Sequence, residues 1–277
     1  MTSTHRAAVL GKPIAHSLSP VLHNAGYAAA GLTGWAYTAI ECAESELPGL
    51  VAGLGPEWRG LSVTMPLKEV ALTVAAEVSP AAAALGVGNT LVRRPDGSWF
   101  ADNTDVIGMV TVLRRAGITD GATIALLGGG GTARAALGAA ARLGHAPVTT
   151  FVRRPEAGAE LAPVADALGV PFRVAPWSDA PHTLGTFDVI VSTVPKGAAD
   201  HLATGPHWPP TTVYFDVVYH PWPTPLAAWA ATAGCPVLSG LDLLHAQALD
   251  QFTHFTGLPA PAAAMREALD RAIATKP

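Results

Sequence analysis

One segment limits the possible folds of this chain more than any other. Residues 122–127 carry no charged side chain and run directly into four glycines, Gly128 to Gly131. A short apolar run of this kind is typical of a strand that is buried on both faces in a parallel sheet. The alanine-rich residues 133–143 follow and predict a helix. The segment therefore predicts the strand–turn–helix unit of an α/β fold.

The rest of the chain predicts two units of this kind. The first 105 residues alternate between strand-like and helix-like segments, with strands expected at 7–10, 37–42, 61–64, 90–93 and 99–101. In the second unit, further strands are expected at 148–152, 172–175, 187–192 and 213–217. Two helices, at 241–255 and 260–274, close the chain. A length of 277 residues suits two domains of ordinary size.

Composition argues against several classes of protein. Hydrophobic residues make up 49% of the chain and charged residues 14%, which is ample material for buried cores. A net charge of −4 without a Lys/Arg cluster argues against a nucleic-acid partner. Cys42 and Cys235 are too few for a disulfide scaffold, and the histidines lack metal-ligand spacing, so we expect no metal. With no membrane-spanning run and no secretory signal at residues 1–6, we expect a cytoplasmic protein without a membrane partner.

The glycine loop matches a dinucleotide fingerprint, with Gly128 and Gly130 followed by Ala133 in the third place. Glycine lets a pyrophosphate approach the backbone, and the helix N-terminus supplies N–H donors. The next strand ends at Arg153 and Arg154, where an NAD site usually has an acidic residue. Guanidinium groups match a phosphate in charge and geometry. We therefore interpret the pair as part of an NADP site, and the alternative is two solvated arginines in a surface loop.

Lys68 and Asp105 are the candidates for acid–base chemistry. The strand at 61–64 leads to Pro66, which predicts the start of a helix with Lys68 in its first turn. The dipole disfavours a cation there, which suggests a functional reason for the lysine. Hydride transfer to a ketone leaves an alkoxide that a lysine can protonate, and a carboxylate across an interdomain cleft would orient that lysine. The alternative is a surface lysine and an aspartate that caps a turn.

Ser17 and Ser19 lie at alternate positions of the loop before Pro20, so both hydroxyls can face the same way. Neutral donors of this kind suit a small carboxylate in a shallow cleft. Solvated serines in a turn are the alternative.

Together these segments resemble the shikimate dehydrogenase family over nearly the whole chain. The resemblance is carried, in chain order, by residues 11–20, 63–68, 88–90 and 103–105, the glycine loop from Gly128, and residues 216–219 and 240–247. It implies NADP-dependent, reversible reduction of 3-dehydroshikimate to shikimate, a step of chorismate and aromatic amino acid biosynthesis.

The resemblance also implies a role for each site residue. The catalytic pair would be Lys68 and Asp105. The substrate carboxylate would be held by Ser17, Ser19 and Tyr219, and the ring hydroxyls by Thr64, Asn89 and Gln247. The cofactor would be held by Gly128, Gly130, Gly131, Thr132, Ala133, Arg153, Arg154, Thr193 and Gly240.

The implied architecture has two α/β domains. Residues 1–105 plus 241–277 would form a substrate-binding, catalytic domain with a mostly parallel sheet, and residues 106–240 a Rossmann-type NADP-binding domain. The chain departs from the family pattern at Ser62, where Asn is common, and at Ala157, where a second phosphate-binding Arg is common. Ser62 implies a shorter or water-mediated substrate contact, and Ala157 leaves the strictness of NADP use open.

Two other functions remain open from the sequence. A relative of the same fold could oxidise quinate or an aminated shikimate with NAD or NADP. A non-catalytic NADP-binding regulatory protein is a further alternative, against which the presence of both Lys68 and Asp105 argues. The expected partner is the small-molecule substrate, and a homodimer is one expected assembly.

Overall fold

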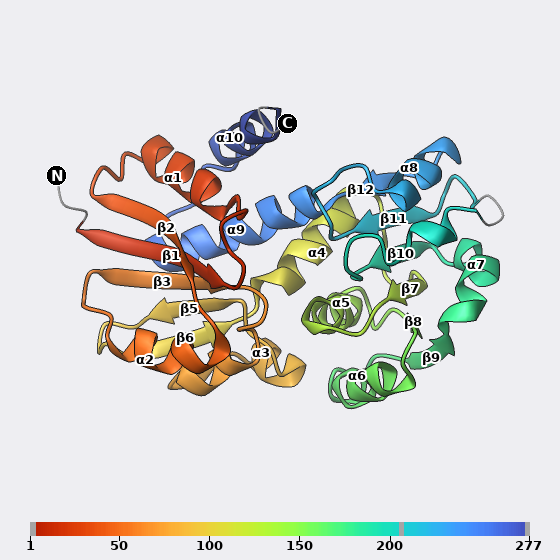
Figure 1. Cartoon of the computed structure of the whole chain (residues 1–277), viewed down its shortest axis with the longest axis horizontal. Helices are drawn as coiled ribbons and strands as arrows, with labels where there is room; N and C mark the ends of the chain where they lie inside the picture. The colour runs from red at the N-terminus through yellow and green to blue at the C-terminus, as the bar shows by residue number, and fades with distance from the viewer. Residues whose placement is uncertain (1–3, 205–207, 275–277) are drawn as a thin grey trace. The chain divides into compact units, whose positions relative to one another are not determined.

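The computed structural model describes residues 4–204 and 208–274. The chain divides into two compact units, each built on a six-stranded sheet (Figure 1). Unit 1 comprises Met1–Thr104 and Leu244–Pro277, and unit 2 comprises Asp105–Leu243. The expected α/β class with two sheets is confirmed.

The sheet of unit 1 is mixed, with strand order β2-β1-β3-β5-β6-β4. Its strands are β1 (His5–Gly11), β2 (Trp35–Glu41), β3 (Trp58–Val63), β4 (Glu77–Val78), β5 (Thr90–Arg93) and β6 (Trp99–Asp102). Among the described strands, three pairings are parallel, and the two that involve β5 are antiparallel. The parallel strands β2, β1 and β3 therefore end at one edge of the sheet, where β3 leads toward Lys68.

The helices of unit 1 cover both faces of this sheet. They are α1 (Ser19–Ala29), α2 (Leu47–Ala52), α3 (Pro80–Leu85), most of α9 (Gly240–Thr256) and α10 (Ala262–Ala274), with 3-10 helices η1 (Glu44–Glu46) and η2 (Val70–Val74). Along β3, Leu61 and Val63 pack with α2 and η2 in one core. Gly60 and Ser62 point to the other face, where Gly60 adjoins the ring of Phe255 on α9. Helices α1 and α10 lie side by side (Figure 1).

The prediction that a helix begins at Pro66 is wrong. Residues 65–69 form turns, and only the short η2 follows them. The carbonyl of Lys68 accepts the N–H of Gly88 over 2.8 Å. Because this carbonyl bonds to a neighbouring segment, it is not used in an i→i+4 helix bond. Lys68 therefore lies in a turn that is tied to the segment before β5.

The sheet of unit 2 is fully parallel among its described strands. Its strands are β7 (Ile124–Leu127), β8 (Val148–Val152), β9 (Phe172–Pro176), β10 (Val189–Ser192), β11 (Val213–Asp216) and β12 (Val237–Leu238). The spatial order β9-β8-β7-β10-β11-β12 is that of a Rossmann-type doubly wound fold. The chain reverses direction along the sheet between β7 and β10, where such folds bind their ligands.

The helices of unit 2 are α4 (Thr104–Arg115), α5 (Gly131–Arg142), α6 (Pro155–Ala167), α7 (Ala180–Thr183) and α8 (Pro225–Thr232), with 3-10 helices η3 (Trp177–Asp179), η4 (Leu184–Thr186) and η5 (Asp200–Leu202). Helices α5 and α6 lie side by side (Figure 1). The strands β7 and β8 are buried along their whole length, which agrees with the uncharged sequence of residues 122–127.

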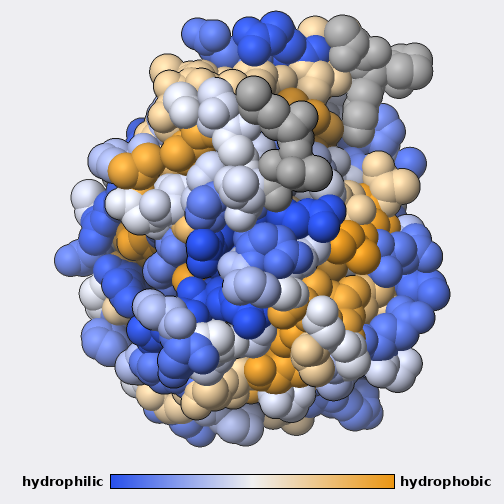
Figure 2. Space-filling view, turned by 90° about the vertical axis from the view of Figure 1, so that its left-hand side faces the viewer, coloured by the Kyte–Doolittle hydropathy of each residue, from blue (hydrophilic) through white to orange (hydrophobic). Residues whose placement is uncertain are grey.

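The molecular surface is mixed in character. On the face shown in Figure 2, hydrophilic side chains cover one part and hydrophobic ones gather beside them. No helix within the described residues is long and apolar enough to cross a membrane.

Candidate active site

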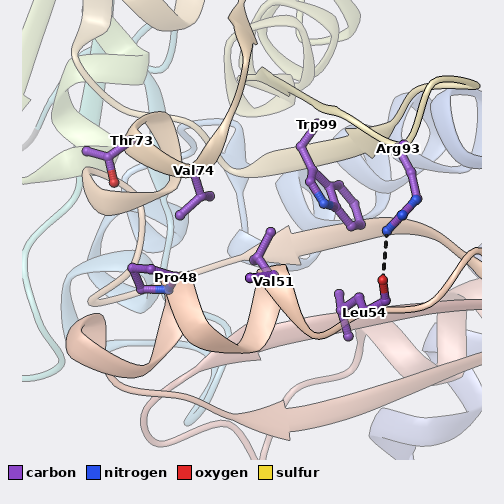
Figure 3. A pocket seen from close by; sticks show the side chains of 9 residues that line it. Pro48, Val51, Leu54, Thr73, Val74, Arg93 and Trp99 are labelled. Atoms are coloured by element: carbon purple, nitrogen blue, oxygen red, sulfur yellow. Dashed lines mark hydrogen bonds between the residues drawn. The ribbon is translucent and has the colours of Figure 1, made fainter.

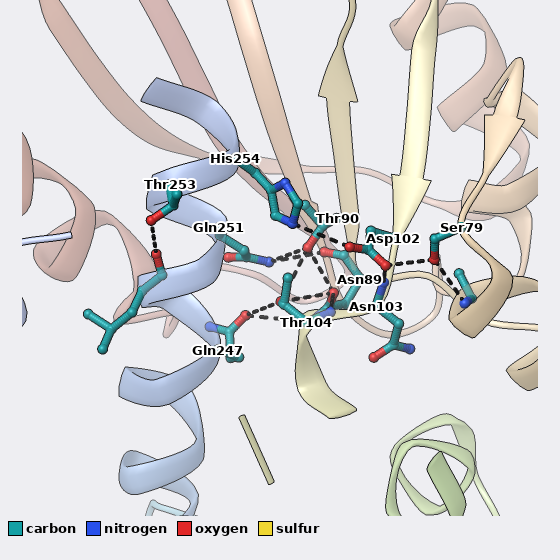
Figure 4. Close-up of polar contacts among 12 residues, drawn as sticks. Ser79, Asn89, Thr90, Asp102, Asn103, Thr104, Gln247, Gln251, Thr253 and His254 are labelled. Atoms are coloured by element: carbon teal, nitrogen blue, oxygen red, sulfur yellow. Dashed lines mark hydrogen bonds and ion pairs between the residues drawn. The ribbon is translucent and has the colours of Figure 1, made fainter. Parts of the chain in front are cut away.

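Asn89 is the centre of a buried polar network in unit 1 (Figure 4). Its side chain, in a residue only 3% exposed, lies just before β5. The Oδ1 atom accepts the backbone N–H of Thr104 at 2.8 Å and the hydroxyl of Thr90 at 2.8 Å. The Nδ2 atom lies 3.5 Å from Oε1 of Gln247. The structure thus brings together two predicted substrate-binding residues, Asn89 and Gln247.

Two glutamines on α9 complete this network. Gln247 and Gln251 are four residues apart and so lie on the same face of the helix. The Oε1 atom of Gln247 lies 3.3 Å from the hydroxyl of Thr104. Gln251 is 1% exposed, and its Nε2 donates to Oγ1 of Thr90 at 2.9 Å. Gln251 was not among the predicted site residues, although two glutamines four residues apart on one helix are a usable signal.

An ion pair lies at one side of this network. His254 Nε2 is 3.3 Å from Oδ2 of Asp102, whose Oδ1 accepts the hydroxyl of Ser79 at 2.6 Å. Burial alone would raise the pKa of Asp102, but bonds from His254, Ser79 and the N–H of Asn103 outweigh it and lower that pKa. The bond to Asp102 raises the pKa of His254 against the effect of its own burial. These contacts hold the end of β6, directly before residues 103–105.

Lys68 and Thr64 are fixed through their backbones. Thr64 directly follows β3, and its N–H donates to the carbonyl of Leu10 at 2.9 Å. Its own carbonyl accepts the N–H of Leu67 at 2.8 Å. Lys68 is half-buried, and its carbonyl is bonded to Gly88, the neighbour of Asn89. Backbone bonds therefore tie the candidate catalytic lysine to the segment that carries the network.

Of the two predicted carboxylate-binding serines, Ser19 begins α1 and Ser17 lies two residues before it. Ser17 is half-buried, and its Oγ accepts the N–H of Ser19 at 3.3 Å. Ser19 is buried, and its hydroxyl bonds to Tyr37, as does that of Ser62 at 2.6 Å. Burial raises the pKa of Tyr37, and these two bonds oppose the shift. Ser62, the family departure noted above, thus lies inside the unit 1 network.

In unit 2 the glycine loop lies at the carboxyl end of β7. Gly128 has φ +109°, and a Cβ there would lie 2.7 Å from Oγ1 of Thr193, which follows β10. A Cβ at Gly129 would lie 3.0 Å from the carbonyl oxygen of Ala157 on α6. Gly128 therefore requires glycine, and a side chain at Gly129 would crowd α6. A Cβ at Gly130 would meet no described atom within 4 Å, so the loop is open on that side.

The helix α5 starts in this loop. Gly131, Thr132 and Ala133 form its first turn, and Ala133 is fully buried. The first N–H groups of a 12-residue helix lack intrahelical partners and carry the positive end of its dipole. The loop thus offers N–H donors beside an open space, which is the geometry that a pyrophosphate requires.

Arg153 and Arg154 follow β8, the strand next to β7 in the sheet. Both are exposed, and Arg154 directly precedes α6. No acidic residue lies between Val152 and Pro155. The two guanidinium groups are therefore accessible to a phosphate on a ribose held at the glycine loop.

Tyr219 follows β11 and is half-buried, which raises the pKa of its phenol. The turn before it is held by Asp216, which is 3% exposed. Asp216 accepts the hydroxyls of Tyr214 at 2.8 Å and Thr224 at 2.9 Å, and the N–H of Val218 at 3.0 Å. Burial raises the pKa of Asp216, and these bonds oppose the shift.

Gly240 begins α9, and its N–H donates to the carbonyl of Val218 at 3.3 Å. A Cβ at Gly240 would overlap the carbonyl oxygen of Val217. Gly240 therefore lies against the turn that leads to Tyr219.

Asp105 is buried in the first turn of α4 and is the first residue of unit 2. Lys68 belongs to unit 1. Their action as a pair remains a prediction.

A separate pocket of about 380 Å³ lies in unit 1 between α2, η2 and the turn that joins β5 to β6 (Figure 3). It is lined by Pro48, Val51, Ala52, Leu54, Thr73, Val74, Arg93, Gly97 and Trp99. Its polar side chains are already engaged, because Arg93 donates to the carbonyl of Leu54 at 3.1 Å and Thr73 to that of Val70 at 2.8 Å. Among residues 4–204 and 208–274, no group of three or more His, Cys, Asp or Glu side chains could hold a metal ion.

Two family models match the chain. One describes the shikimate dehydrogenase substrate-binding domain and matches residues 9–91. The other describes the shikimate 5'-dehydrogenase C-terminal domain and matches residues 240–269.

Similar proteins cover nearly the whole chain. A shikimate dehydrogenase (NADP(+)) of Moorella thermoacetica is 36% identical over 98% of this chain and 94% of its own length. The crystal structure of Mycobacterium tuberculosis shikimate dehydrogenase shares 44% identity with a TM-score of 0.87, and covers 96% of this chain and 99% of that one. A Thermus thermophilus shikimate 5-dehydrogenase in complex with NADP(H) and shikimate shares 32% identity with a TM-score of 0.84, and covers 97% and 99% of the two chains. The resemblance found in the sequence is confirmed: this chain belongs to the shikimate dehydrogenase family.

Proposed function

We propose that this chain interconverts shikimate and 3-dehydroshikimate with NADP, and that Lys68 and Asp105 are its catalytic pair. The observation that carries the proposal is the network around Asn89. It joins the amides of Asn89 and Gln247 in one buried cluster, next to the segment that is bonded to Lys68. A substrate rich in ring hydroxyls suits such paired amides, because each amide offers a donor and an acceptor.

The cofactor assignment rests on the chemistry of the unit 2 loop. The positive φ of Gly128 and the open side of Gly130 fit a pyrophosphate at the start of α5. The exposed Arg153 and Arg154 suit the additional phosphate of NADP. Thr193 and Gly240 would lie beside the nicotinamide. When bound, NADP accepts a hydride from carbon 3 of shikimate, and NADPH returns it in the reverse direction.

Lys68 and Asp105 would handle the proton of the same reaction. As the hydroxyl at carbon 3 of shikimate becomes a ketone, its proton passes to Lys68, and in the reverse direction Lys68 protonates the alkoxide oxygen. Asp105 would accept hydrogen bonds from the ammonium group of Lys68 and from a neighbouring substrate hydroxyl. Ser17, Ser19 and Tyr219 would hold the carboxylate, while Thr64, Asn89 and Gln247 would bind the ring hydroxyls. This division assigns substrate binding mainly to unit 1 and cofactor binding to unit 2.

A stoichiometric product assay tests this proposal. The protein is incubated with shikimate and NADP, and 3-dehydroshikimate and NADPH are each quantified. Formation of the two products in equal amounts supports the reaction. No product, or NADPH without dehydroshikimate, would overturn it. We also infer a cytoplasmic location, which fractionation of cells would test, and a homodimer as one possible assembly, which sedimentation of the purified chain would test.

A further inference from the structure

The orientation of the Asn89 amide is set by a backbone group. The N–H of Thr104 lies 2.8 Å from Oδ1 of Asn89. A backbone N–H can only donate, so the oxygen of the amide must face it. The Nδ2 donor of Asn89 is therefore directed to the other side.

A second backbone group sets the orientation of Gln251. Its Nε2 lies 3.2 Å from the carbonyl oxygen of Asn89, which can only accept. The Oε1 of Gln251 must then face Ser62, whose hydroxyl donates to it at 2.7 Å. Ser62 in turn accepts the hydroxyl of Tyr37 at 2.6 Å.

These two fixed amides determine the direction of the hydroxyl between them. Thr90 Oγ1 accepts from Nε2 of Gln251 at 2.9 Å. Its single proton is directed to Oδ1 of Asn89 at 2.8 Å, because this acceptor is closer than Oγ1 of Thr104 at 3.3 Å. The bonds run in one direction through Tyr37, Ser62, Gln251, Thr90 and Asn89, and we call these five residues the relay (Figure 4 shows its last three members). All five are 5% exposed or less, and Gln251 is 1% exposed.

The same logic applies to Gln247. Its Nε2 donates to the carbonyl of Leu244 at 2.9 Å, so its Oε1 faces Asn89 and Thr104. An amide donor, Nδ2 of Asn89, and an amide acceptor, Oε1 of Gln247, therefore lie 3.5 Å apart with fixed identities. A substrate hydroxyl that lies beside both atoms would accept from the first and donate to the second.

We propose that Gln251 is a positioning residue for substrate recognition, which acts through the relay to hold the Asn89 amide with its donor toward the substrate. This inference rests on the proposed function, since it takes Asn89 as a substrate-binding residue. Gln251 itself does not contact the substrate. Its two donor hydrogens supply Thr90 and the Asn89 carbonyl, so its loss would let Thr90 donate elsewhere and would remove one of the bonds that, together with the N–H of Thr104, hold the Asn89 amide.

The test is a double-mutant cycle between Gln251 and Asn89, with kcat and KM measured for shikimate and NADP. Gln251→Met removes the amide at similar volume, and we expect KM for shikimate to rise about tenfold while KM for NADP changes less than about twofold. Asn89→Ala removes the presented donor and should raise KM at least as much. Because Gln251 acts through Asn89, the double variant should match Asn89→Ala alone. If the double variant instead raised KM for shikimate by about a hundredfold, the product of the two single effects, the positioning role would be overturned.

The variant Gln251→Glu provides a second readout that a general packing role would not produce. An ionised carboxylate can donate to neither Thr90 nor the Asn89 carbonyl, whereas the protonated acid restores one of these two bonds. The ratio of variant to wild-type KM should therefore fall toward one as the pH is lowered through the pKa of the introduced acid. A ratio that does not change with pH would contradict the relay.

Thr253→Ala is the matched control on the same helix. The Thr253 hydroxyl is exposed and donates only within α9, to the carbonyl of Leu249 at 3.1 Å. The KM of the Thr253→Ala variant for shikimate should equal that of wild type. A rise as large as that of Gln251→Met would show that KM follows general damage to α9, and the positioning role would be wrong. If the wild-type protein did not turn over shikimate, the proposed function would be wrong, and the role of the relay would be wrong with it.

Discussion

The backbone N–H of Thr104 donates to Oδ1 of Asn89 over 2.8 Å, at the first residue of α4. The first N–H groups of a helix have no partner within it, and here a side chain from another segment satisfies one of them. The next residue along the chain is Asp105. The helix α4, which carries the candidate catalytic carboxylate of Asp105, therefore begins at a residue that is bonded to the candidate substrate-binding amide of Asn89. This bond, together with that from the Thr104 hydroxyl to the same oxygen at 3.1 Å, ties the first residue of α4 to Asn89.

Replacement of Lys68 by Ala tests the proton transfer. A positioned acid–base group contributes roughly 10²–10⁴-fold to the rate, so we expect kcat for shikimate oxidation to fall by that factor. KM for shikimate should change far less, because the hydroxyl contacts remain. Steady-state kinetics at saturating NADP measure both parameters. A variant that keeps more than about half of the wild-type kcat would be incompatible with the role of Lys68.

The exposed arginines after β8 are predicted to determine the cofactor preference. Replacing both Arg153 and Arg154 by Ala removes charge-assisted bonds that only the additional phosphate of NADP can receive, each worth about 1.5–3 kcal/mol. NADP should bind much more weakly, and NAD binding should stay nearly constant. Calorimetric titration with each cofactor measures this.

Arg142→Ala is the control for that experiment, since Arg142 is an exposed arginine at the other end of α5. It should leave both affinities unchanged. Equal losses for NADP and NAD in the double arginine variant would show that Arg153 and Arg154 do not recognise the phosphate.

The serines at the start of α1 are predicted to hold the substrate carboxylate. Ser17→Ala and Ser19→Ala each remove one hydrogen bond to a charged group, so each should raise KM for shikimate about tenfold. An analogue in which a neutral hydroxymethyl group replaces the carboxylate isolates the effect. Wild type should use this analogue poorly, and the variants should lose little further activity on it. Equal losses on both substrates would place the carboxylate elsewhere and leave the serines a structural role.

His23 gives the fold a dependence on pH. It is fully buried, and its ring stacks on Tyr37 with 4.2 Å between centroids. Burial lowers the pKa of His23 from 6.5 to about 3, and the Gln251 amide opposes this in part. The unfolded chain therefore binds a proton that the folded chain excludes as the pH falls from 6.5 toward about 3. Over this range His23 lowers the free energy of unfolding by up to about 1.4 kcal/mol per pH unit.

Replacing His23 by Phe keeps a stacked ring and removes the titration. Chemical denaturation at several pH values should show a shallower loss of stability for His23→Phe than for wild type. His182→Gln, at an exposed position of α7, should follow the wild-type curve. Identical slopes for wild type and His23→Phe would show that the buried histidine does not cause the acid sensitivity.

The positions of the main strands along the chain could be predicted from the sequence where one physical signal dominates. The uncharged run at 122–127 followed by glycine specified β7 and α5, because burial on both faces excludes charge and the turn requires glycine. The boundaries of β5 and β8 were predicted without error. The helix α6 was missed, although Pro155 is its first residue, a position that proline favours.

The relay and the turn at Lys68 could not be predicted, because both depend on contacts between distant segments. Ser62 and Gln251 are 189 residues apart in the chain and bond at 2.7 Å. Neither residue type indicates a partner when it is seen alone. At Lys68 the local signal of Pro66 favoured a helix, but the bond from Gly88 to the Lys68 carbonyl holds a turn instead.

Turnover with four substrate and cofactor combinations tests the central claim most directly. Shikimate and quinate are each combined with NADP and with NAD, and kcat/KM is measured from the rate of reduced cofactor formation. We predict that shikimate with NADP gives the highest kcat/KM. Shikimate with NAD should give a lower kcat/KM, because NAD lacks the phosphate that Arg153 and Arg154 would bind. Quinate should be poorer because of its extra hydroxyl at the carbon that bears the carboxylate. A higher kcat/KM for quinate, or equal values for NAD and NADP, would contradict the account.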